Sequence, residues 1–300
     1  MELKEFAEEV LKGVAEKAGD IFNVSITENL KNNGVKKTAI IMMSPEKQVR
    51  PSIYLEGYYD EYKNRGRGIG EIVGEVYQEL MEHMDDLKEA GLDGFRKWDM
   101  MKSRIYAKLI NFESNKELLK GKPYRKFLDL AVVYQVQVEG VKDGSTGAFL
   151  VNDNYMEIWR QTEERLYQAA ASNMRLAGEP LFESMEEVLH SMMPGFQLPS
   201  PVSTPVEMHV LTNKARVFGA AEILDSGTLK RVSDELGGDV IVLPSSVHEC
   251  IIIPADETVP YRKLADMVTE INADAVSIEE RLSDHVYLYE RKAGTLRIAA

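Results

Sequence analysis

The sequence predicts an α+β protein of two domains, in which antiparallel sheets are built from hairpins and helices pack on one face. Short segments that alternate apolar and polar residues are joined by turn residues, as in residues 127–151, which is typical of antiparallel hairpins. Longer segments, such as residues 67–89, carry their apolar residues on one side, as amphipathic helices do. No succession of strand, helix and strand units predicts a long parallel sheet.

Length and composition predict a folded chain with a substantial core. The 300 residues are 44% hydrophobic and 28% charged, which are ordinary values for a soluble globular protein. The formal net charge of -13 repels polyphosphate, so nucleic acid is not an expected partner. A single cysteine, Cys250, excludes an internal disulfide. With neither a signal peptide nor an apolar run long enough for a bilayer, we expect a cytoplasmic protein without a membrane partner.

The first domain is expected to span residues 1–175. Leu3, Phe6 and Val10 recur on one side of the opening segment, which predicts a helix. The apolar period then changes to two, which predicts strands separated by polar turns. The elements expected, in order, are a helix at residues 2–17, strands at 22–26 and 38–43 around Asn32-Asn33-Gly34, a strand at 52–55, and a helix at 67–89 that Gly91 ends.

The middle of the chain has the clearest alternation. Residues 127–139 place apolar side chains on one face and polar ones on the other, which predicts an antiparallel strand with one solvent-exposed face. Asp143-Gly144 supplies the positive φ values of a type I′ turn, so residues 146–151 are expected to return as a paired strand. Asn152 or Asp153 then caps a helix expected to run to about residue 173.

Residues 176–205 are expected to be a linker with a short helix, because four prolines between 194 and 205 resist both helix and sheet interior. The second domain is expected to span residues 206–300 and to repeat the use of hairpins and capped helices. Its expected elements are a hairpin of 206–211 with 215–221, a helix from Asp225 to Leu236, strands at 240–243 and 247–253, a helix from Pro260 to about Ile271, a capping box at Ser277 to Glu280, and a hairpin of 286–289 with 295–298.

The order of elements also suggests a weak internal repeat. A strand at 104–111, a helix near 115–120 and the hairpin and helix of 127–172 follow the same order as the elements of 216–272. Residue identities do not support a duplication. Because α+β proteins often run through strand, helix, hairpin and helix, a chance agreement stays open beside the repeat.

The segment Pro244 to Cys250 is the most specific candidate for chemistry. Alternation places Ser246 and His248 on one side of a strand, and a serine beside a histidine can act as nucleophile and base. Side chains two apart on a strand lie roughly 6 to 7 Å apart, which is too far for that hydrogen bond, so holding the turn is the favoured role. The candidate catalytic residues are Ser246, His248, Glu249 and Asp284.

The histidines do not form a metal-binding pattern. None is paired with a second histidine at helical spacing beside a carboxylate, as zinc motifs require. A site assembled from distant segments stays open as an alternative, with His209, His248, Glu249 and Asp284 as its ligands. We therefore assign no metal site and predict no cofactor.

A glycine cluster precedes the helix expected at residues 67–89. Arg65, Arg67 and Gly68 lie where the positive end of a helix attracts anions. The spacing matches neither a dinucleotide-binding loop nor a P-loop. A solvated loop is therefore favoured over an anion site.

Tyrosines gather just before this cluster. Tyr58, Tyr59 and Tyr62 offer the rigid, half-polar area that partner surfaces use. The alternative is that Tyr54 and Tyr58 pack beneath the following helix. Packing is the favoured interpretation, with an interaction surface as the second.

Three segments of the second domain resemble a known bacterial family. They are His209 to Asn213 with Phe218 to Ala221, Leu243 to Glu249, and Leu282 to Tyr287. The family is catalogued only as a domain of unknown function and is typical of anaerobic, gut-associated bacteria. The likeness is strongest over residues 206–292, and weaker pieces such as 51–55 extend it over nearly the whole chain. The resemblance implies an intracellular protein and assigns no catalytic residue.

We expect an acidic, cytoplasmic protein that acts by binding, without a reaction of its own. Its expected partner is another protein or a small ligand in a groove between the two domains. The alternative is a hydrolase-like enzyme whose site lies around His248, Ser246, Glu249 and Asp284. A titratable group with a perturbed pKa in a cleft would favour an enzyme, and an exposed apolar patch would favour a binding protein.

Overall fold

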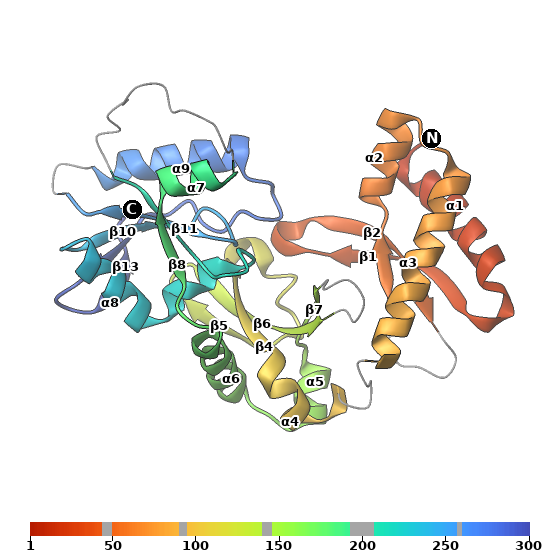
Figure 1. The fold of residues 1–300 in the computed structure, drawn as a ribbon, viewed down its shortest axis with the longest axis horizontal. Coiled ribbons are helices and arrows are strands. Elements are labelled where there is room, and N and C mark those ends of the chain that lie inside the picture. Colours follow the sequence, from red (N-terminus) through yellow and green to blue (C-terminus); the bar gives the residue numbers. More distant parts are fainter. Residues whose placement is uncertain (44–49, 90–94, 140–145, 193–206, 257–259) are drawn as a thin grey trace. The chain divides into compact units, whose positions relative to one another are not determined.

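The structure, a computed structural model, describes residues 1–43, 50–89, 95–139, 146–192, 207–256 and 260–300. Its helices and antiparallel sheets confirm the α+β class (Figure 1). By contacts the chain divides into two compact units: unit 1 is Met1–Met101 with Gln137–Ala148, and unit 2 is Lys102–Val136 with Phe149–Ala300. These are groupings by contact, so the domain boundaries expected from the sequence stay a prediction.

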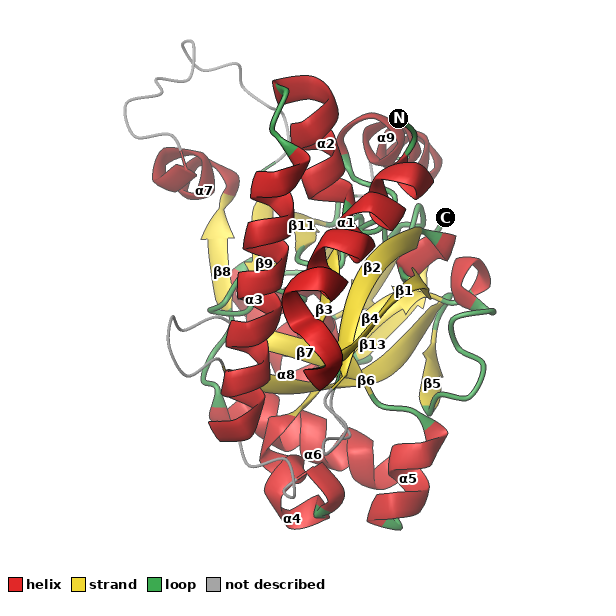
Figure 2. Ribbon diagram, turned by 90° about the vertical axis from the view of Figure 1, so that its right-hand side faces the viewer, coloured by secondary structure: helices red, strands yellow, loops and turns green. Residues whose placement is uncertain are grey.

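Unit 1 packs helices on a three-stranded sheet with the order β1-β2-β3 (Figure 2). The hairpin pairs Ile26 with Ile40, and β3 joins the other edge of β2. The sequence therefore predicted these strands and the two long helices. The elements are α1 (Leu3–Ala18), β1 (Asn23–Leu30), β2 (Lys36–Met43), β3 (Ser52–Tyr54), α2 (Glu56–Arg65), α3 (Ile69–Glu89) and α4 (Trp98–Met101).

The core of unit 1 lies between α1, α3 and the sheet. Phe6 and Val10 of α1 and Ile72 of α3 are fully buried against β2. The two helices meet closely at Gly13, where a Cβ atom would lie 2.7 Å from Cγ1 of Val73. A glycine inside a helix lowers stability by about 1 kcal/mol relative to alanine. Here the close approach of the two helices explains why this position is a glycine.

Unit 2 contains a six-stranded antiparallel sheet with the order β13-β12-β10-β11-β9-β8. The central β10 is buried along its whole length, as its unbroken apolar sequence requires. Val268 of α9 packs on Ile241 and Ile253 of this sheet. The elements are β8 (Leu181–Ser184), α7 (Met185–Met192), β9 (His209–Thr212), α8 (Ser226–Glu235), β10 (Val240–Leu243), β11 (Cys250–Pro254), α9 (Tyr261–Ala275), β12 (Tyr287–Glu290) and β13 (Thr295–Ile298).

A second sheet is arranged around β6, which pairs with β4, β5 and β7. The helix α6 packs on β4, and Nδ2 of its Asn173 donates to the carbonyl oxygens of Lys102 and Ile105 at 2.7 and 2.8 Å. These hydrogen bonds fix the C-terminal half of α6. The elements are β4 (Ile105–Asn111), β5 (Tyr124–Phe127), β6 (Leu130–Glu139), β7 (Thr146–Leu150), α5 (Asp153–Trp159) and α6 (Glu163–Leu176).

Several expected elements are interrupted by residues other than glycine in the left-handed conformation. Leu128 (φ 55°) separates β5 from β6 within the expected strand at 127–139. Arg160 (φ 53°) ends α5, and Thr162 caps α6, so the expected helix at 153–173 is two helices. The strand expected at 215–221 is wrong. Phe218 (φ 56°) leads instead into the 3-10 helix η6 (Gly219–Leu224).

Three smaller expectations also differ. The strand expected from residue 247 begins at Cys250, and the capping-box residues 277–280 form a turn with no helix after it. The region 216–272 opens with η6 and not with a strand, so the internal repeat is not confirmed. The turn at Asp143-Gly144, Gly91 and the prolines between 194 and 205 lie outside the described residues.

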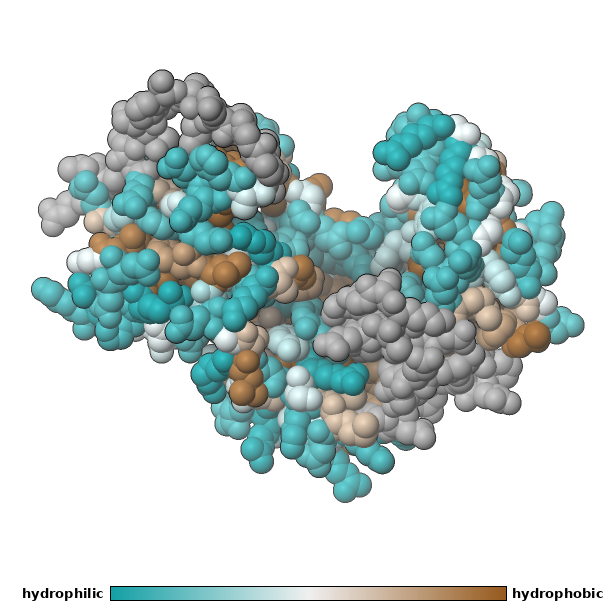
Figure 3. Space-filling view, in the orientation of Figure 1, coloured by the Kyte–Doolittle hydropathy of each residue, from teal (hydrophilic) through white to brown (hydrophobic). Residues whose placement is uncertain are grey.

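Hydrophilic side chains cover most of the described part of the face shown in Figure 3. Within the described ranges, no helix is long and apolar enough to cross a membrane.

Candidate functional site

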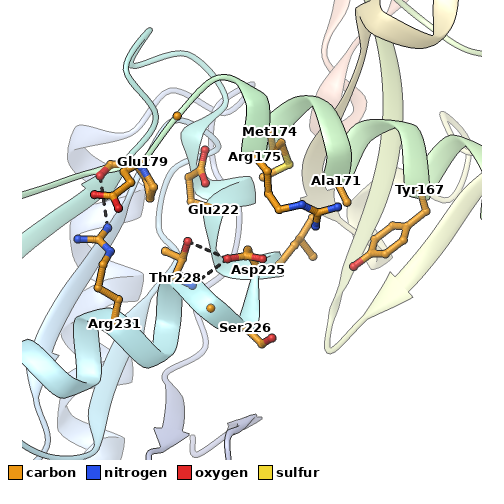
Figure 4. A pocket seen from close by; sticks show the side chains of 14 residues that line it. Tyr167, Ala171, Met174, Arg175, Glu179, Glu222, Asp225, Ser226, Thr228 and Arg231 are labelled. Carbon is orange, nitrogen blue, oxygen red and sulfur yellow. Dashed lines mark hydrogen bonds between the residues drawn. The ribbon is translucent and has the colours of Figure 1, made fainter.

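A pocket of about 450 Å³ opens in unit 2 between α6 and the junction of η6 with α8 (Figure 4). This volume is within the range of about 300 to 1,000 Å³ that is usual for small-molecule sites. Its lining combines both signs of charge with a few apolar side chains. The lining residues are Tyr167, Ala171, Met174, Arg175, Gly178, Glu179, Pro180, Glu222, Leu224, Asp225, Ser226, Gly227, Thr228 and Arg231.

The junction of η6 with α8 is held by the helix cap that the sequence predicted. Oδ2 of Asp225 accepts hydrogen bonds from the backbone N–H and the hydroxyl of Thr228, at 2.8 and 3.1 Å. Aspartate is among the best N-cap residues because it satisfies amides that a helix leaves free. The backbone N–H of Asp225 also donates to the carbonyl oxygen of Glu222 at 3.2 Å. The cap therefore fixes Glu222 at the pocket wall.

Glu222 is the most unusual titratable group of the pocket. The residue is only 8% exposed, and the described residues provide no hydrogen-bond donor to its carboxylate. Burial, with a contribution from the nearby Asp225 carboxylate, raises the pKa of Glu222 to about 7, although the positive charge of Arg231 opposes this shift. Glu222 therefore gains or loses its proton near neutral pH.

Two arginines bring positive charge to the same pocket from different helices (Figure 4). Arg231 of α8 donates through Nη2 to the carbonyl oxygen of Pro180 at 3.4 Å. Arg175, in the last turn of α6, is exposed, and no described side chain forms an ion pair with it. The pocket thus offers a buried carboxyl group and an accessible guanidinium to the same ligand.

Ser246 and His248 come together in the way that favours a structural role. Oγ of Ser246 accepts from the backbone N–H of His248 at 3.0 Å. Nδ1 of His248 accepts from the backbone N–H of Phe218 at 3.3 Å, and the two rings stack with centroids 5.3 Å apart. These contacts hold the loop before β11, and Nδ1 is engaged by backbone and not by a serine hydroxyl.

The two acidic candidates are not part of that arrangement. The carboxylate nearest to His248 belongs to Glu280, whose Oε1 lies 3.5 Å from Nε2. Asp284 accepts through Oδ1 from Nδ2 of Asn272 on α9, at 2.7 Å. Glu249 makes no contact with the His248 side chain among the described interactions. The structure therefore joins Ser246 with His248 and leaves Glu249 and Asp284 elsewhere.

A metal site from distant segments is not formed. His209 stacks on the ring of Phe182, with centroids 4.7 Å apart, and its Nε2 lies 3.4 Å from Glu207. Within the described part of the chain, no three His, Cys, Asp or Glu side chains gather closely enough to hold an ion. The described residues therefore do not bring His209, His248, Glu249 and Asp284 together.

In the glycine cluster of unit 1, the arginine Arg67 is paired with acidic side chains. Arg67 forms ion pairs with Glu61, at 2.5 Å, and with Glu75, and these carboxylates raise the pKa of its guanidinium. The carbonyl oxygen of Gly68 accepts the first helical hydrogen bond of α3, and Arg65 is exposed at the end of α2. The Arg67 charge is therefore already compensated, which weighs against an anion site.

The tyrosines of α2 pack inward. Phe6 of α1 meets the rings of Tyr59 and Tyr62 at centroid distances of 5.5 and 5.3 Å. The hydroxyl of Tyr58 donates to Glu79 at 2.6 Å, and burial raises the pKa of Tyr58. These contacts support packing over an exposed interaction surface.

The pocket itself was not predicted. Its lining comes from two segments, residues 167–180 and 222–231, which are separated by other elements along the chain, so their meeting depends on the fold. One signal was present in the sequence: Glu222 is the single acid within the apolar run from Phe218 to Leu224. A charged residue that interrupts a buried run is often functional, because burial without a partner is costly.

Comparison with known proteins gives a family and no activity. Residues 3–291 match the Family of unknown function (DUF5688), which confirms the resemblance noted in the sequence. The chain matches no curated protein and no solved structure. A functional interpretation must therefore come from the residues of this chain.

Proposed function

The chain belongs to the Family of unknown function (DUF5688), and we propose that it binds a small organic amine in the pocket around Glu222. The observation that carries this proposal is a buried carboxyl group at the wall of a pocket, to which none of the residues that the structure describes donates a hydrogen bond. An unpaired buried carboxylate is unfavourable, so a ligand that donates hydrogen bonds to it gains more than it would at a solvated site.

The chemistry of Glu222 favours a cationic donor. An ammonium group donates up to three hydrogen bonds and stabilises the ionised carboxylate, and charge-assisted hydrogen bonds are roughly twice as strong as neutral ones. Because the pKa of Glu222 is about 7, ionising it to receive a cation costs little free energy at neutral pH. An amine therefore fits this pocket better than an anion does.

The other side chains of the pocket indicate which further groups the ligand carries besides its amine. Arg175 is exposed beside the pocket and can pair with a carboxylate on the ligand. Met174 and Leu224 add apolar wall for a short aliphatic part. Free amino acids and short diamines are the simplest members of this class. The proposal is of binding alone, and a cytoplasmic location remains a prediction from the sequence.

The test is ligand-induced stabilisation of the full chain. Thermal unfolding is measured at pH 7.5 with L-lysine, L-arginine and 1,4-diaminobutane, and with diacetylated L-lysine and diacetylated 1,4-diaminobutane, in which neither nitrogen carries a charge. A bound ligand at about 100 times its Kd stabilises a protein by about 2.7 kcal/mol, which raises Tm by several degrees. We expect at least one amine to raise Tm and its acetylated counterpart to have no effect.

Two variants make the result specific to the pocket. Glu222→Gln removes the carboxylate with little change of shape and should abolish the stabilisation. Glu235→Gln changes an exposed acid at the end of α8, outside the pocket lining, and should retain the stabilisation. The proposal is wrong if none of the three amines raises Tm, or if Glu222→Gln responds as strongly as the wild type.

A further inference from the structure

A second polar cluster in unit 2 shares no residue with the pocket and is organised around Asp129. Its carboxylate accepts from the hydroxyl of Tyr287 at 2.5 Å and from the hydroxyl of Ser283 at 2.7 Å. Oδ2 also lies 3.2 Å from Nδ1 of His285. The Asp129 side chain is 16% exposed, whereas that of His285 is 48% exposed. A largely buried acid therefore supports an accessible imidazole.

The local sequence explains how the cluster forms. Asp129 follows Leu128, whose left-handed conformation turns the chain between β5 and β6. Ser283, His285 and Tyr287 are spaced by two in the segment that enters β12, so their side chains point to the same side. The spacing of two thus directs all three polar groups toward one carboxylate.

The contact with Asp129 determines the state of the imidazole. A carboxylate beside Nδ1 holds the ring proton on Nδ1, which leaves the lone pair of Nε2 available. No described residue forms a hydrogen bond with Nε2 of His285. His285 therefore has the arrangement of an oriented, solvent-facing base.

Ser283 does not complete a catalytic triad. Its Oγ donates to Asp129, accepts from the backbone N–H of His285 at 3.0 Å, and is buried. It lies 3.4 Å from Nδ1, the nitrogen that carries the proton, and not beside Nε2. A nucleophilic serine must instead give its proton to the free nitrogen of the base. Ser283 is therefore not placed to be the nucleophile, whereas water has access to the exposed imidazole.

We propose that His285 is a general base for the hydrolysis of small carboxylic esters, with Asp129 as its positioning residue. Nε2 takes a proton from water while the water oxygen bonds to the carbonyl carbon of the ester. The tetrahedral intermediate then breaks its bond to the alcohol oxygen, which receives the proton held on Nε2. The products are an acid and an alcohol, and the imidazole is returned unchanged.

The test uses hydrolysis of p-nitrophenyl acetate by the full chain between pH 6 and 9. General-base catalysis contributes about 10² to 10⁴-fold, and an exposed site should lie at the low end. We expect His285→Ala to lose at least tenfold of the protein-catalysed rate. His190→Ala, which removes another exposed histidine, should keep the wild-type rate. A His285→Ala rate within twofold of the wild type would overturn the proposal.

Two further measurements separate positioning from folding and base catalysis from direct attack. In the wild type, imidazole ¹⁵N shifts should show the proton of neutral His285 on Nδ1, and Asp129→Asn should shift that population toward Nε2 and reduce the rate. A wild-type ring protonated on Nε2 would overturn the role of Asp129. A burst of p-nitrophenol with an acetyl group recovered on His285 would overturn the general-base role.

Discussion

Asp225 accepts two hydrogen bonds from Thr228, one from the backbone N–H at 2.8 Å and one from the hydroxyl at 3.1 Å. The same carboxylate lies near Glu222 and helps to raise its pKa to about 7. Because Asp225 is held as the cap of α8, it cannot turn away from Glu222 without weakening the helix. The start of α8 and the titration of the pocket are thus linked through one side chain.

Removing the charge of Asp225 should lower the pKa of Glu222. Asp225→Asn keeps a good N-cap residue but removes the second-largest cause of the raised pKa. ¹³C chemical shifts of the Glu222 carboxyl, followed through a pH titration, measure the change. Glu235→Gln, on the exposed side of the same helix, should leave the titration unchanged. An unchanged or higher pKa in Asp225→Asn would contradict this account.

The buried Glu222 should make the wild type lose stability as the pH rises. An acid whose pKa is higher in the folded chain than in the unfolded chain keeps its proton to a higher pH when folded. The free energy of unfolding therefore decreases as the pH rises from the lower pKa to the higher one. For Glu222 this window runs from its ordinary value of 4.5 to about 7, which corresponds to about 3 kcal/mol.

The matched comparison is with Glu222→Gln, which has no group to ionise at this position. Denaturant unfolding at pH 5, 6, 7 and 8 should show Glu222→Gln gaining stability relative to the wild type as the pH rises. The remaining charges are common to both proteins and cancel in the difference. If the difference in unfolding free energy between Glu222→Gln and the wild type stayed constant from pH 5 to pH 8, the pKa of Glu222 would not be raised in the folded chain.

Gly219 should not tolerate a side chain. A Cβ atom there would lie 2.5 Å from the backbone nitrogen of Asn213 and 2.7 Å from the carbonyl oxygen of His248, and backbone cannot move aside as a flexible side chain can. Gly219→Ala should therefore lose about 2 kcal/mol of unfolding free energy or more. Gly238→Ala, where a Cβ meets nothing within 4 Å, should change it by less than about 0.5 kcal/mol.

His248 should contribute to stability and not to chemistry. His248→Ala removes the acceptor for the N–H of Phe218 and the stacked ring, and should cost about 2 kcal/mol in urea unfolding. His190→Ala, on the exposed surface of α7, is the control. A loss below about 0.5 kcal/mol would mean that the loop before β11 does not depend on this histidine.

Local patterns were enough to predict most of the fold. The period of apolar residues identified the hairpin of β1 with β2 and the long helix α3. Capping residues such as Asp225 and Pro260 marked helix starts correctly because their effects act within one turn. Where the expectation failed, after β9, the chain direction depends on the left-handed Phe218 and on contacts of Gly219 with distant backbone. No local pattern reports such contacts.

The candidate sites were harder to predict because each depends on residues far apart in the chain. Asp129 and His285 are separated by 156 residues, and neither stands out among the 49 acids and five histidines of the sequence. Glu222 carried one signal, an acid within an apolar run, whose meaning appears only when the walls of the pocket are known. Ser246 and His248 are only two residues apart in sequence, and the structural role favoured for them agrees with their contacts.

The most direct test of the central claim is the pKa of Glu222, measured by ¹³C NMR with and without saturating L-lysine, L-arginine or 1,4-diaminobutane. The account predicts a value of about 7 in the free protein and a lower value with at least one of these amines, because a bound cation stabilises the carboxylate. A free value near 4.5, or a value that none of the three amines lowers, would contradict an amine-binding pocket at Glu222.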